Sequence, residues 1–355
     1  MGNICHSGPV LRSDAPPPRP PPSSSPRKSL TFGRDPALKR EDYIFSNARG
    51  PSCLIKQPGS INGQQFLLDG CSDCDIFLLD NCTAVQIDDC TNCRIVVGPC
   101  DSSLFVRNCT NCTIVAAVQQ FRTRDCDALD VFLYSVTEPV LELSTNVRVA
   151  CFPLTYFSLQ QQFDRAGFSV WNNRWSEIFN FTPDHGAWKP LPSSGGHESP
   201  LVSTMEMQQD GTMALWKLPS WTAEELGLTL DVAQLVVPLT SGVVARCEDV
   251  TGVVVVFPTP HTQLMLEFVQ AVTVKAEGAE NLTLLIRTRQ LKLTAPQAKT
   301  LFPLDARAAQ RAEEAAKATA GSIIMEFQGP SCETRVAAVL QTARFAGEAA
   351  ATNAV

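Results

Sequence analysis

The stretch VQQFRTRDC, residues 118–126, places two arginines, Arg122 and Arg124, one residue apart in a segment with the pattern of a buried strand. Side chains alternate between the two faces of a strand, so both guanidinium groups are expected to project from the same face. A guanidinium is permanently charged, and its planar fork can bridge two oxygens of one anion. Gln119 and Gln120 precede the pair and would add amide donors beside it. These residue types suit an anionic group such as a phosphate.

A plainer interpretation competes with this one. An arginine on a strand is usually a solvated charge or half of a surface ion pair, and such pairs contribute little. Pattern alone favours that interpretation. The chain also contains no G-x-x-x-x-G-K-[ST] phosphate-binding loop and no Gly-Lys pair at all. A protein without a nucleotide cradle of its own, but with a rigidly held arginine, could instead complete the active site of another protein.

The segment that must position these arginines is a repeat. Three Cys-x-x-Cys pairs, which begin at Cys71, Cys90 and Cys109, recur with a period of 19 residues. Strand-like pieces such as CDIFLLD and CRIVVGP lie between them. Repeats of this length stack, because each unit buries its apolar face only against its neighbours. We therefore predict that residues 41–184 form a mainly β domain, a parallel β-helix with turns of about 19 residues.

A zinc site is the main alternative for the cysteines, since the pairs that include Cys74 and Cys90 satisfy a C-x2-C-x15-C-x2-C spacing. Three pairs are present rather than two, however, and the next turn has Leu129 where its second cysteine would stand. A metal ligand cannot be replaced by leucine, whereas a small inward-facing apolar side chain can. No histidine is close in sequence. We expect a ladder of buried cysteines and no metal site.

Aligning the turns on their first cysteine indicates which side chains face inward. Two columns are almost wholly apolar and should line the interior: Phe66, Val85, Leu104 and Phe121, and Leu68, Ile87, Val106 and Thr123. The two columns between them are mixed and should face outward: Leu67, Gln86, Phe105 and Arg122, and Asp69, Asp88, Arg107 and Arg124. Both arginines are thus expected outside, at a fixed separation on a rigid element.

The first 40 residues differ in composition from the rest of the chain. They include PPPRPPPSSSPRKS, which cannot form a core, and carry seven Lys/Arg against two Asp. We interpret residues 1–40 as a disordered, basic, proline-rich arm. The start MGNIC suggests myristoylation of Gly2 and palmitoylation of Cys5, although His6 stands where the motif prefers Ser or Thr. One myristoyl chain binds membranes only marginally, so Cys5 and the basic arm would supply the second signal.

The remaining segments complete the domain organisation. We predict a linker over 185–234, an α/β domain over 235–346, in which strands and helices alternate, and a tail over 347–355. The net charge of −7 and pI near 5.2 argue against general nucleic-acid binding. No run of 18 apolar residues suggests a membrane span, and no secretory signal is present. A reducing compartment is therefore expected for the 14 cysteines.

QQFRTRDC, the preceding cysteine turns and the later FSVWNNRWSEIFNFTP resemble the tubulin-cofactor-C domain. Together with the MGNIC start and the second domain, they make the chain similar to the retinitis pigmentosa 2 protein family. The resemblance implies a GTPase-activating protein for an Arf-like small GTPase, with Arg122 as the arginine finger. By the same resemblance Gln119 and Gln120 would contact the GTPase. Glu142 and Phe181 would lie on the docking surface.

Several roles stay open at this point. Arg124 is either a second contact or a strut for Arg122. Glu142 is equally well a solvated carboxylate, and Phe181 equally well a core ring. The second domain resembles a ferredoxin-like, nucleoside-diphosphate-kinase-like module, but its only histidine, His261, lacks an N-x-x-H-G-S-D context, so we expect no kinase activity.

The resemblance also implies partners and a location. The chain would be no enzyme by itself and have no cofactor, because the partner GTPase carries GTP and Mg²⁺. It would be anchored by lipids at the cytoplasmic face of the plasma membrane and at the ciliary or flagellar base, in support of lipidated-cargo traffic. One rival function is that of a tubulin-folding cofactor that acts on tubulin-bound GTP. The N-terminal acylation motif argues against this function. Another is a zinc-binding or scaffolding β-helix.

Overall fold

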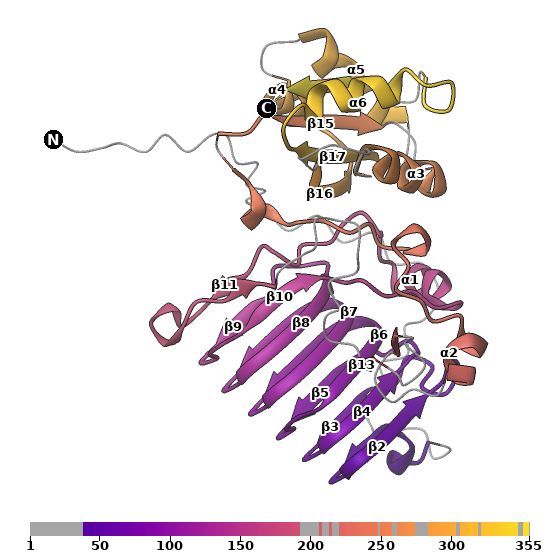
Figure 1. Ribbon diagram of the computed structural model, residues 1–355, viewed down its shortest axis with the longest axis vertical. Helices are drawn as coiled ribbons and strands as arrows, with labels where there is room; N and C mark the ends of the chain where they lie inside the picture. The colour runs from indigo at the N-terminus through magenta and orange to yellow at the C-terminus, as the bar shows by residue number, and fades with distance from the viewer. Residues whose placement is uncertain are drawn as a thin grey trace, which may run out of the picture.

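The computed structural model describes two bodies, a solenoid and a smaller α/β domain above it (Figure 1). The residues described are 38–191, 206–207, 213–214, 220–247, 249–257, 261–273, 283–302, 306–318, 321–346 and 351–354. Gly2 and Cys5, the expected lipidation sites, lie outside them. None of the helices in these ranges is long and apolar enough to cross a bilayer.

The solenoid is a parallel β-helix with two principal sheets. The first sheet contains β1 (Ile44–Ser46), β3 (Phe66–Asp69), β5 (Val85–Asp88), β9 (Val140–Glu142) and β11 (Phe179–Asn180). The second contains β2 (Arg49–Lys56), β4 (Ser72–Leu78), β8 (Asp127–Ser135), β10 (Arg148–Cys151) and β12 (Lys189–Pro190). The long strands β6 (Arg94–Arg107) and β7 (Thr110–Arg124) pass through a corner and belong to both. Phe66, Val85 and Leu104 pair across successive turns at spacings of 19 residues, which confirms the predicted coil.

The corners of the coil explain the Asn and Asp residues that flank the cysteines. Two positions in each turn have a left-handed backbone, which Asn, Asp and Gly adopt more readily than other residues. They include Asp89, Asn108 and Asp125 before the first cysteine, and Asp73, Asn92 and Asn111 before the second, with φ between 52° and 59°. Asn146 (φ 53°) holds the equivalent position before Val147. Ala128 (φ 53°) and Leu143 (φ 46°) break the pattern and are strained. Asn, Asp and Gly at most of these positions thus favour the left-handed backbone of the corners.

The interior of the coil is a continuous apolar core. Both columns predicted to face inward are buried, including Phe121 and Thr123 beneath the two arginines. Cys71, Cys90, Cys109 and Cys126 stack with them, and Leu129 continues the column of Cys74, Cys93 and Cys112. Each of these thiols donates to the backbone carbonyl two residues earlier, for example Cys109 Sγ to Arg107 O at 3.1 Å. The ladder fills the corners and holds the turns in register.

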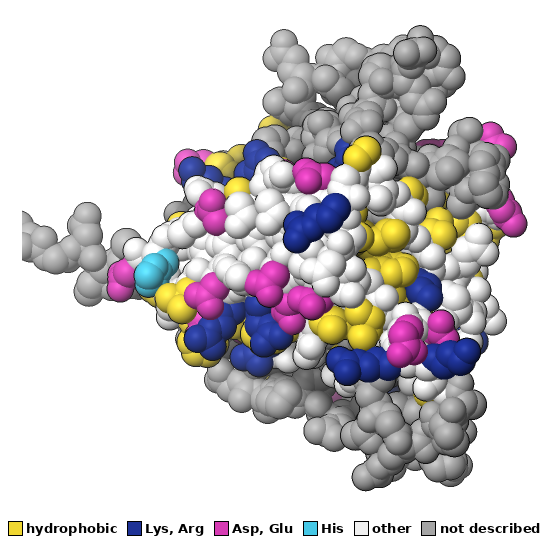
Figure 2. Space-filling view, turned by 90° about the horizontal axis from the view of Figure 1, so that it is seen from below, with side chains coloured by type: hydrophobic (Ala, Val, Ile, Leu, Met, Phe, Trp, Pro, Cys, Tyr) yellow, Lys and Arg dark blue, Asp and Glu magenta, His cyan; other side chains and the backbone are white. Residues whose placement is uncertain are grey.

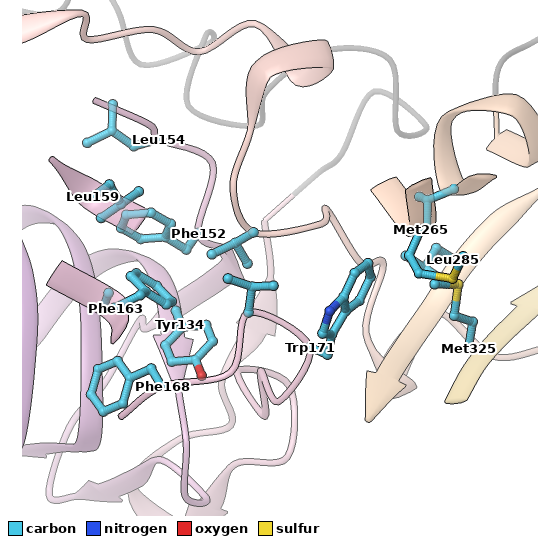
Figure 3. Close-up of a cluster of buried hydrophobic side chains, with 14 of the residues drawn as sticks. Tyr134, Phe152, Leu154, Leu159, Phe163, Phe168, Trp171, Met265, Leu285 and Met325 are labelled. Carbon is cyan, nitrogen blue, oxygen red and sulfur yellow. The ribbon is translucent and has the colours of Figure 1, made fainter. Parts of the chain in front are cut away.

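A second core covers the outer surface of the second sheet. Aromatic side chains that point out of the coil, such as Phe77, Phe132 and Tyr134, are buried by the segment 152–175, which includes α1 (Leu159–Ala166). Figure 3 shows this cluster and Trp171, which lies between it and Met265, Leu285 and Met325 of the C-terminal domain. One core therefore joins the solenoid to the second domain.

Short elements are described between the solenoid and β15. They include η2 (Pro183–His185), β13 (Glu206–Met207), β14 (Met213–Ala214), α2 (Ser220–Leu226), η4 (Val232–Gln234) and η5 (Val243–Ala245). The strand β12 also lies within 185–234, where we expected a linker, and it extends the second sheet by pairing with β10. A strand of two residues, such as β12, is too short to produce a periodic sequence pattern, so it could not be predicted from the sequence.

The C-terminal domain has the predicted ferredoxin-like α/β topology. Its elements follow as β15 (Gly252–Phe257), α3 (Thr262–Thr273), β16 (Leu284–Leu291), α4 (Ala295–Leu301), α5 (Ala306–Ala318), β17 (Ser322–Gln328), α6 (Cys332–Leu340) and β18 (Ala351–Ala354). The sheet order is β16-β17-β15-β18 and every neighbouring pair is antiparallel. This order, with helices between the strands, is the split βαβ arrangement. The strand β18 lies in the segment expected as a tail.

Candidate functional site

Arg122 lies near the C-terminal end of β7, on the outer face of the first sheet. Its register neighbours are Phe105 on β6 and Val140 on β9. The guanidinium carbon lies 6.0 Å from the centre of the Phe105 ring. The side chain is exposed and, within the residues that the structure describes, it makes no ion pair. Arg122 is thus an exposed cation between two apolar register neighbours.

The other outward-facing column, which includes Asp88, Arg107 and Arg124, differs from that of Arg122 because its arginines form ion pairs. Arg107 donates to Asp88 through Nε at 2.8 Å and Nη2 at 2.5 Å. The Asp88 carboxylate beside it raises the pKa of Arg107. Arg124 lies 3.3 Å from Asp125 and 4.0 Å from the Glu142 carboxylate, its register partner on β9. The structure therefore gives Arg124 acidic neighbours and leaves Arg122 without one among the described residues. Figure 2 shows one face of the molecule, on which acidic and basic side chains lie side by side next to a hydrophobic patch.

The edge of the first sheet beyond Arg122 is aromatic. Phe179 on β11 pairs with Val140, and Phe181 N donates to Leu141 O at 2.8 Å. The rings of Phe179 and Phe181 are 50% and 59% exposed and meet edge to face at 4.8 Å between centroids. Phe181 is therefore a surface ring and not a core ring. We call the surface formed by Phe105, Arg122, Val140, Phe179 and Phe181 the arginine face.

The strand that carries Arg122 is held from below and from both sides. Phe121 and Thr123 are buried, and the Thr123 hydroxyl lies 3.1 Å from the Ser144 hydroxyl inside the coil. Gln119 and Gln120 are half-buried at the start of the exposed stretch. The Gln119 carbonyl accepts from both the backbone N and the hydroxyl of Thr137 at 3.0 Å. The sheet thus fixes the backbone from which the Arg122 side chain projects.

The structure places the predicted site residues on neighbouring strands of the solenoid. Arg122, Arg124, Glu142, Phe181 and the two glutamines lie on β7, β9 and the end of β11, as a single surface requires. Phe179 and Val140 were missed. The alternation of Phe179 with Phe181 and of Val140 with Glu142 was a usable signal, since each pair is two residues apart on a strand.

The cysteines have the geometry of a packing ladder. All seven of the ladder are reduced and buried, and burial raises the pKa of the Cys74 thiol to about 11, which keeps it protonated at neutral pH. Elsewhere in the coil burial likewise raises the pKa of Cys100 to about 12. Across the described ranges no three His, Cys, Asp or Glu side chains gather as possible metal ligands. Hydrogen bonds from neighbouring cysteines lower the pKa of Cys71, Cys93 and Cys109. The packing interpretation therefore rests on the burial of the seven thiols and on their bonds to backbone carbonyls.

Comparisons with known proteins agree with the motifs. Residues 63–181 match the family model described as Tubulin binding cofactor C. Protein XRP2 of Homo sapiens is 37% identical over 280 residues, which cover 78% of this chain and 73% of that protein. Protein XRP2 of Danio rerio is 46% identical over 167 residues, 46% of this chain and 44% of that protein. The solved structure of Tubulin Binding Cofactor C from Leishmania major aligns over 34% of this chain and 85% of that chain, with 22% identity and a TM-score of 0.31.

Proposed function

Because the chain belongs to the Protein XRP2 family, the retinitis pigmentosa 2 protein family, we propose that it activates GTP hydrolysis by an Arf-like small GTPase. In this proposal the protein has no nucleotide chemistry of its own. It binds the GTP-bound partner through the arginine face and inserts Arg122 into the partner's active site.

One observation carries the proposal: Arg122 is exposed, its register neighbours are Phe105 and Val140, and Phe179 lies one strand beyond Val140. Among the described residues no carboxylate forms an ion pair with Arg122. A surface arginine whose purpose is solubility or an ion pair has no need of such neighbours. An arginine that must enter a partner's phosphate site does need them, because apolar contacts around it exclude water when the partner docks. In a water-poor site the charge acts on the phosphate oxygens with much less screening.

The chemistry follows from phosphoryl transfer. Negative charge develops on the oxygens between the β- and γ-phosphates as the bond to the γ-phosphoryl group breaks. A guanidinium supplied in trans stabilises that charge and accelerates hydrolysis by about 10³- to 10⁵-fold. Arginine suits this task better than lysine, because its planar fork reaches two oxygens at once. The partner GTPase binds the attacking water and the Mg²⁺.

The neighbouring residues have supporting roles. Gln119 and Gln120, which precede Arg122 on β7, offer amide donors to the partner, and Phe181 provides apolar surface for docking. Arg124 is oriented by Asp125 and Glu142, so its charge is partly neutralised. We assign Arg124 and Glu142 to polar contacts with the GTPase at the rim and not to catalysis.

The experiment is single-turnover GTP hydrolysis by candidate Arf-like GTPases, with and without the protein. Arg122→Ala should abolish the acceleration, and Arg122→Lys should restore only a small part of it. Arg148→Ala is the matched control, because Arg148 is an exposed arginine on the second sheet, paired with Asp130 at 2.6 Å. It should act like the parent protein. Acceleration seen only with tubulin and further cofactors would favour a tubulin-folding role instead.

The membrane anchor and the second domain belong to the same proposal. Acylation of Gly2 and Cys5, with the basic arm, would hold the activator at the cytoplasmic face of the plasma membrane or the ciliary or flagellar base. There it would support release of lipidated cargo. His261 is exposed, immediately before α3, and we assign the second domain to a structural or binding role and not to phosphoryl transfer.

A further inference from the structure

A chain of alternating charges links the arginine face to the C-terminal domain. Arg174 Nη2 donates to Glu138 Oε1 at 2.6 Å and to Glu177 Oε2 at 2.7 Å, and Arg174 Nε donates to Glu177 Oε2 at 2.9 Å. The other oxygen of Glu177 pairs with Arg289 on β16. The chain of Glu138, Arg174, Glu177 and Arg289 carries no net charge and crosses from one domain to the other.

The two glutamates of this ion-pair chain lie next to β9 and β11, the strands beside Arg122. Glu138 lies in the corner that leads into β9, whose Val140 pairs with Arg122. The next residue, Pro139, accepts a backbone hydrogen bond from Phe179 at 2.8 Å. Glu177 comes two residues before Phe179 on the segment that leads into β11. Arg174 therefore clamps together the two segments that carry the apolar wall of the arginine face.

The C-terminal domain completes the clamp from the other side. Arg289 is 20% exposed, and besides Glu177 it donates to the Asn173 carbonyl at 3.2 Å. The neighbouring residues of β16 hold the same segment: Thr288 donates to Trp171 O at 2.8 Å, and Gln290 N donates to Asn172 Oδ1 at 2.7 Å. Burial lowers the pKa of Arg289 to about 10, which still leaves it charged at neutral pH.

We propose that Arg174 and Arg289 are positioning residues for GTPase activation. They hold the wall formed by β9 and β11 at a fixed place relative to Arg122, and through them the C-terminal domain sets how far the finger reaches into a docked partner. This inference rests on the proposed function for its kinetic consequence but not for its structural one. Misplacement of a catalytic group by about 1 Å can cost up to about 100-fold in rate, so a modest loosening of the wall has a measurable effect.

The test uses Arg174→Met and Arg289→Met in the full chain, which keep an unbranched apolar stem and remove the charged guanidinium group. Amide hydrogen exchange of the free protein should become faster in residues 136–142 and 176–181 in both variants and stay unchanged in β4 and β5. With an Arf-like GTPase in excess, kcat should fall about three- to tenfold and KM should change less than about twofold. Arg174→Lys should recover most of the loss, since it retains a donor for both glutamates.

Arg344→Met is the matched control, because Arg344 pairs with Glu267 at 2.8 Å within the C-terminal domain. It should change neither exchange nor kinetics. Because the two links are in series, the double variant Arg174→Met with Arg289→Met should lose little more than the worse single variant. Unchanged exchange in residues 136–142 in both variants would overturn the positioning role. Faster exchange with no acceleration by the parent protein on any Arf-like GTPase would leave the clamp standing and refute the proposed function.

Discussion

The exposed ring of Phe181 gives a quantitative prediction for docking. A phenylalanine side chain buries about 150–250 Å² when fully covered. Since 59% of Phe181 is exposed, about 100 Å² is free to be covered by a partner. At about 25 cal/mol per Å² complete coverage contributes about 2.5 kcal/mol, or about 60-fold in affinity. Coverage at a rim is incomplete and docking has entropic costs, so we expect about a tenfold effect for Phe181→Ala.

The assay is steady-state activation of the GTPase at varied concentrations of its GTP-bound form. Phe181→Ala should raise KM about tenfold and leave kcat within about twofold of the parent, because the ring acts in docking and not in the chemical step. Phe157→Ala is the matched control. Phe157 is even more exposed, at 78%, but lies against Gly227 at the end of α2, away from the arginine face. Equal losses in both variants, or a loss confined to kcat in Phe181→Ala, would refute the docking role.

Three further predictions concern the scaffold and the anchor. Ala128→Asn should raise the free energy of unfolding by about 1 kcal/mol, because asparagine adopts the left-handed backbone of this position more readily than alanine. Its side chain can also continue the ladder in which the Asn111 amide donates to Asn92 at 2.8 Å. Chemical denaturation measures the change in stability, and a lower denaturation midpoint would contradict this role of the corner residues. Elemental analysis of purified protein should find no stoichiometric zinc, and a chelator should not shift the melting temperature; one bound zinc per chain would overturn the ladder. Gly2→Ala should move the protein from the membrane to the soluble fraction, and unchanged membrane association would remove the anchor.

The coil was predictable because its signals repeat. Cysteine spacing fixed the turn length, the apolar columns fixed the inward face, and alternation then placed Arg122 outside. The same columns set Asp88 beside Arg107, an ion pair that the structure contains. Repetition makes such inference robust, since an error in one turn is corrected by its neighbours.

The parts that escaped prediction are short or non-local. The strands β9 and β11 have three and two residues, too few for a periodic pattern, yet they form the wall beside Arg122. The second core was also hidden, because Phe77 and Phe132 point out of the coil and their cover comes from residues 152–175 and from the second domain. The clamp around Arg174 and Glu177 also includes residues far away in sequence, because only the folded chain brings Glu138 to Arg174 and Arg289 to Glu177.

In the proposed mechanism a stiff coil presents Arg122 to the GTP bound by a partner. The most direct measurement is the single-turnover hydrolysis rate of a GTP-bound Arf-like GTPase at saturating activator, for the parent protein, Arg122→Ala and Arg148→Ala. We expect acceleration of about 10³-fold or more by the parent and by Arg148→Ala, and loss of nearly all of it in Arg122→Ala while binding to the GTPase persists. Full acceleration by a folded Arg122→Ala protein would contradict it.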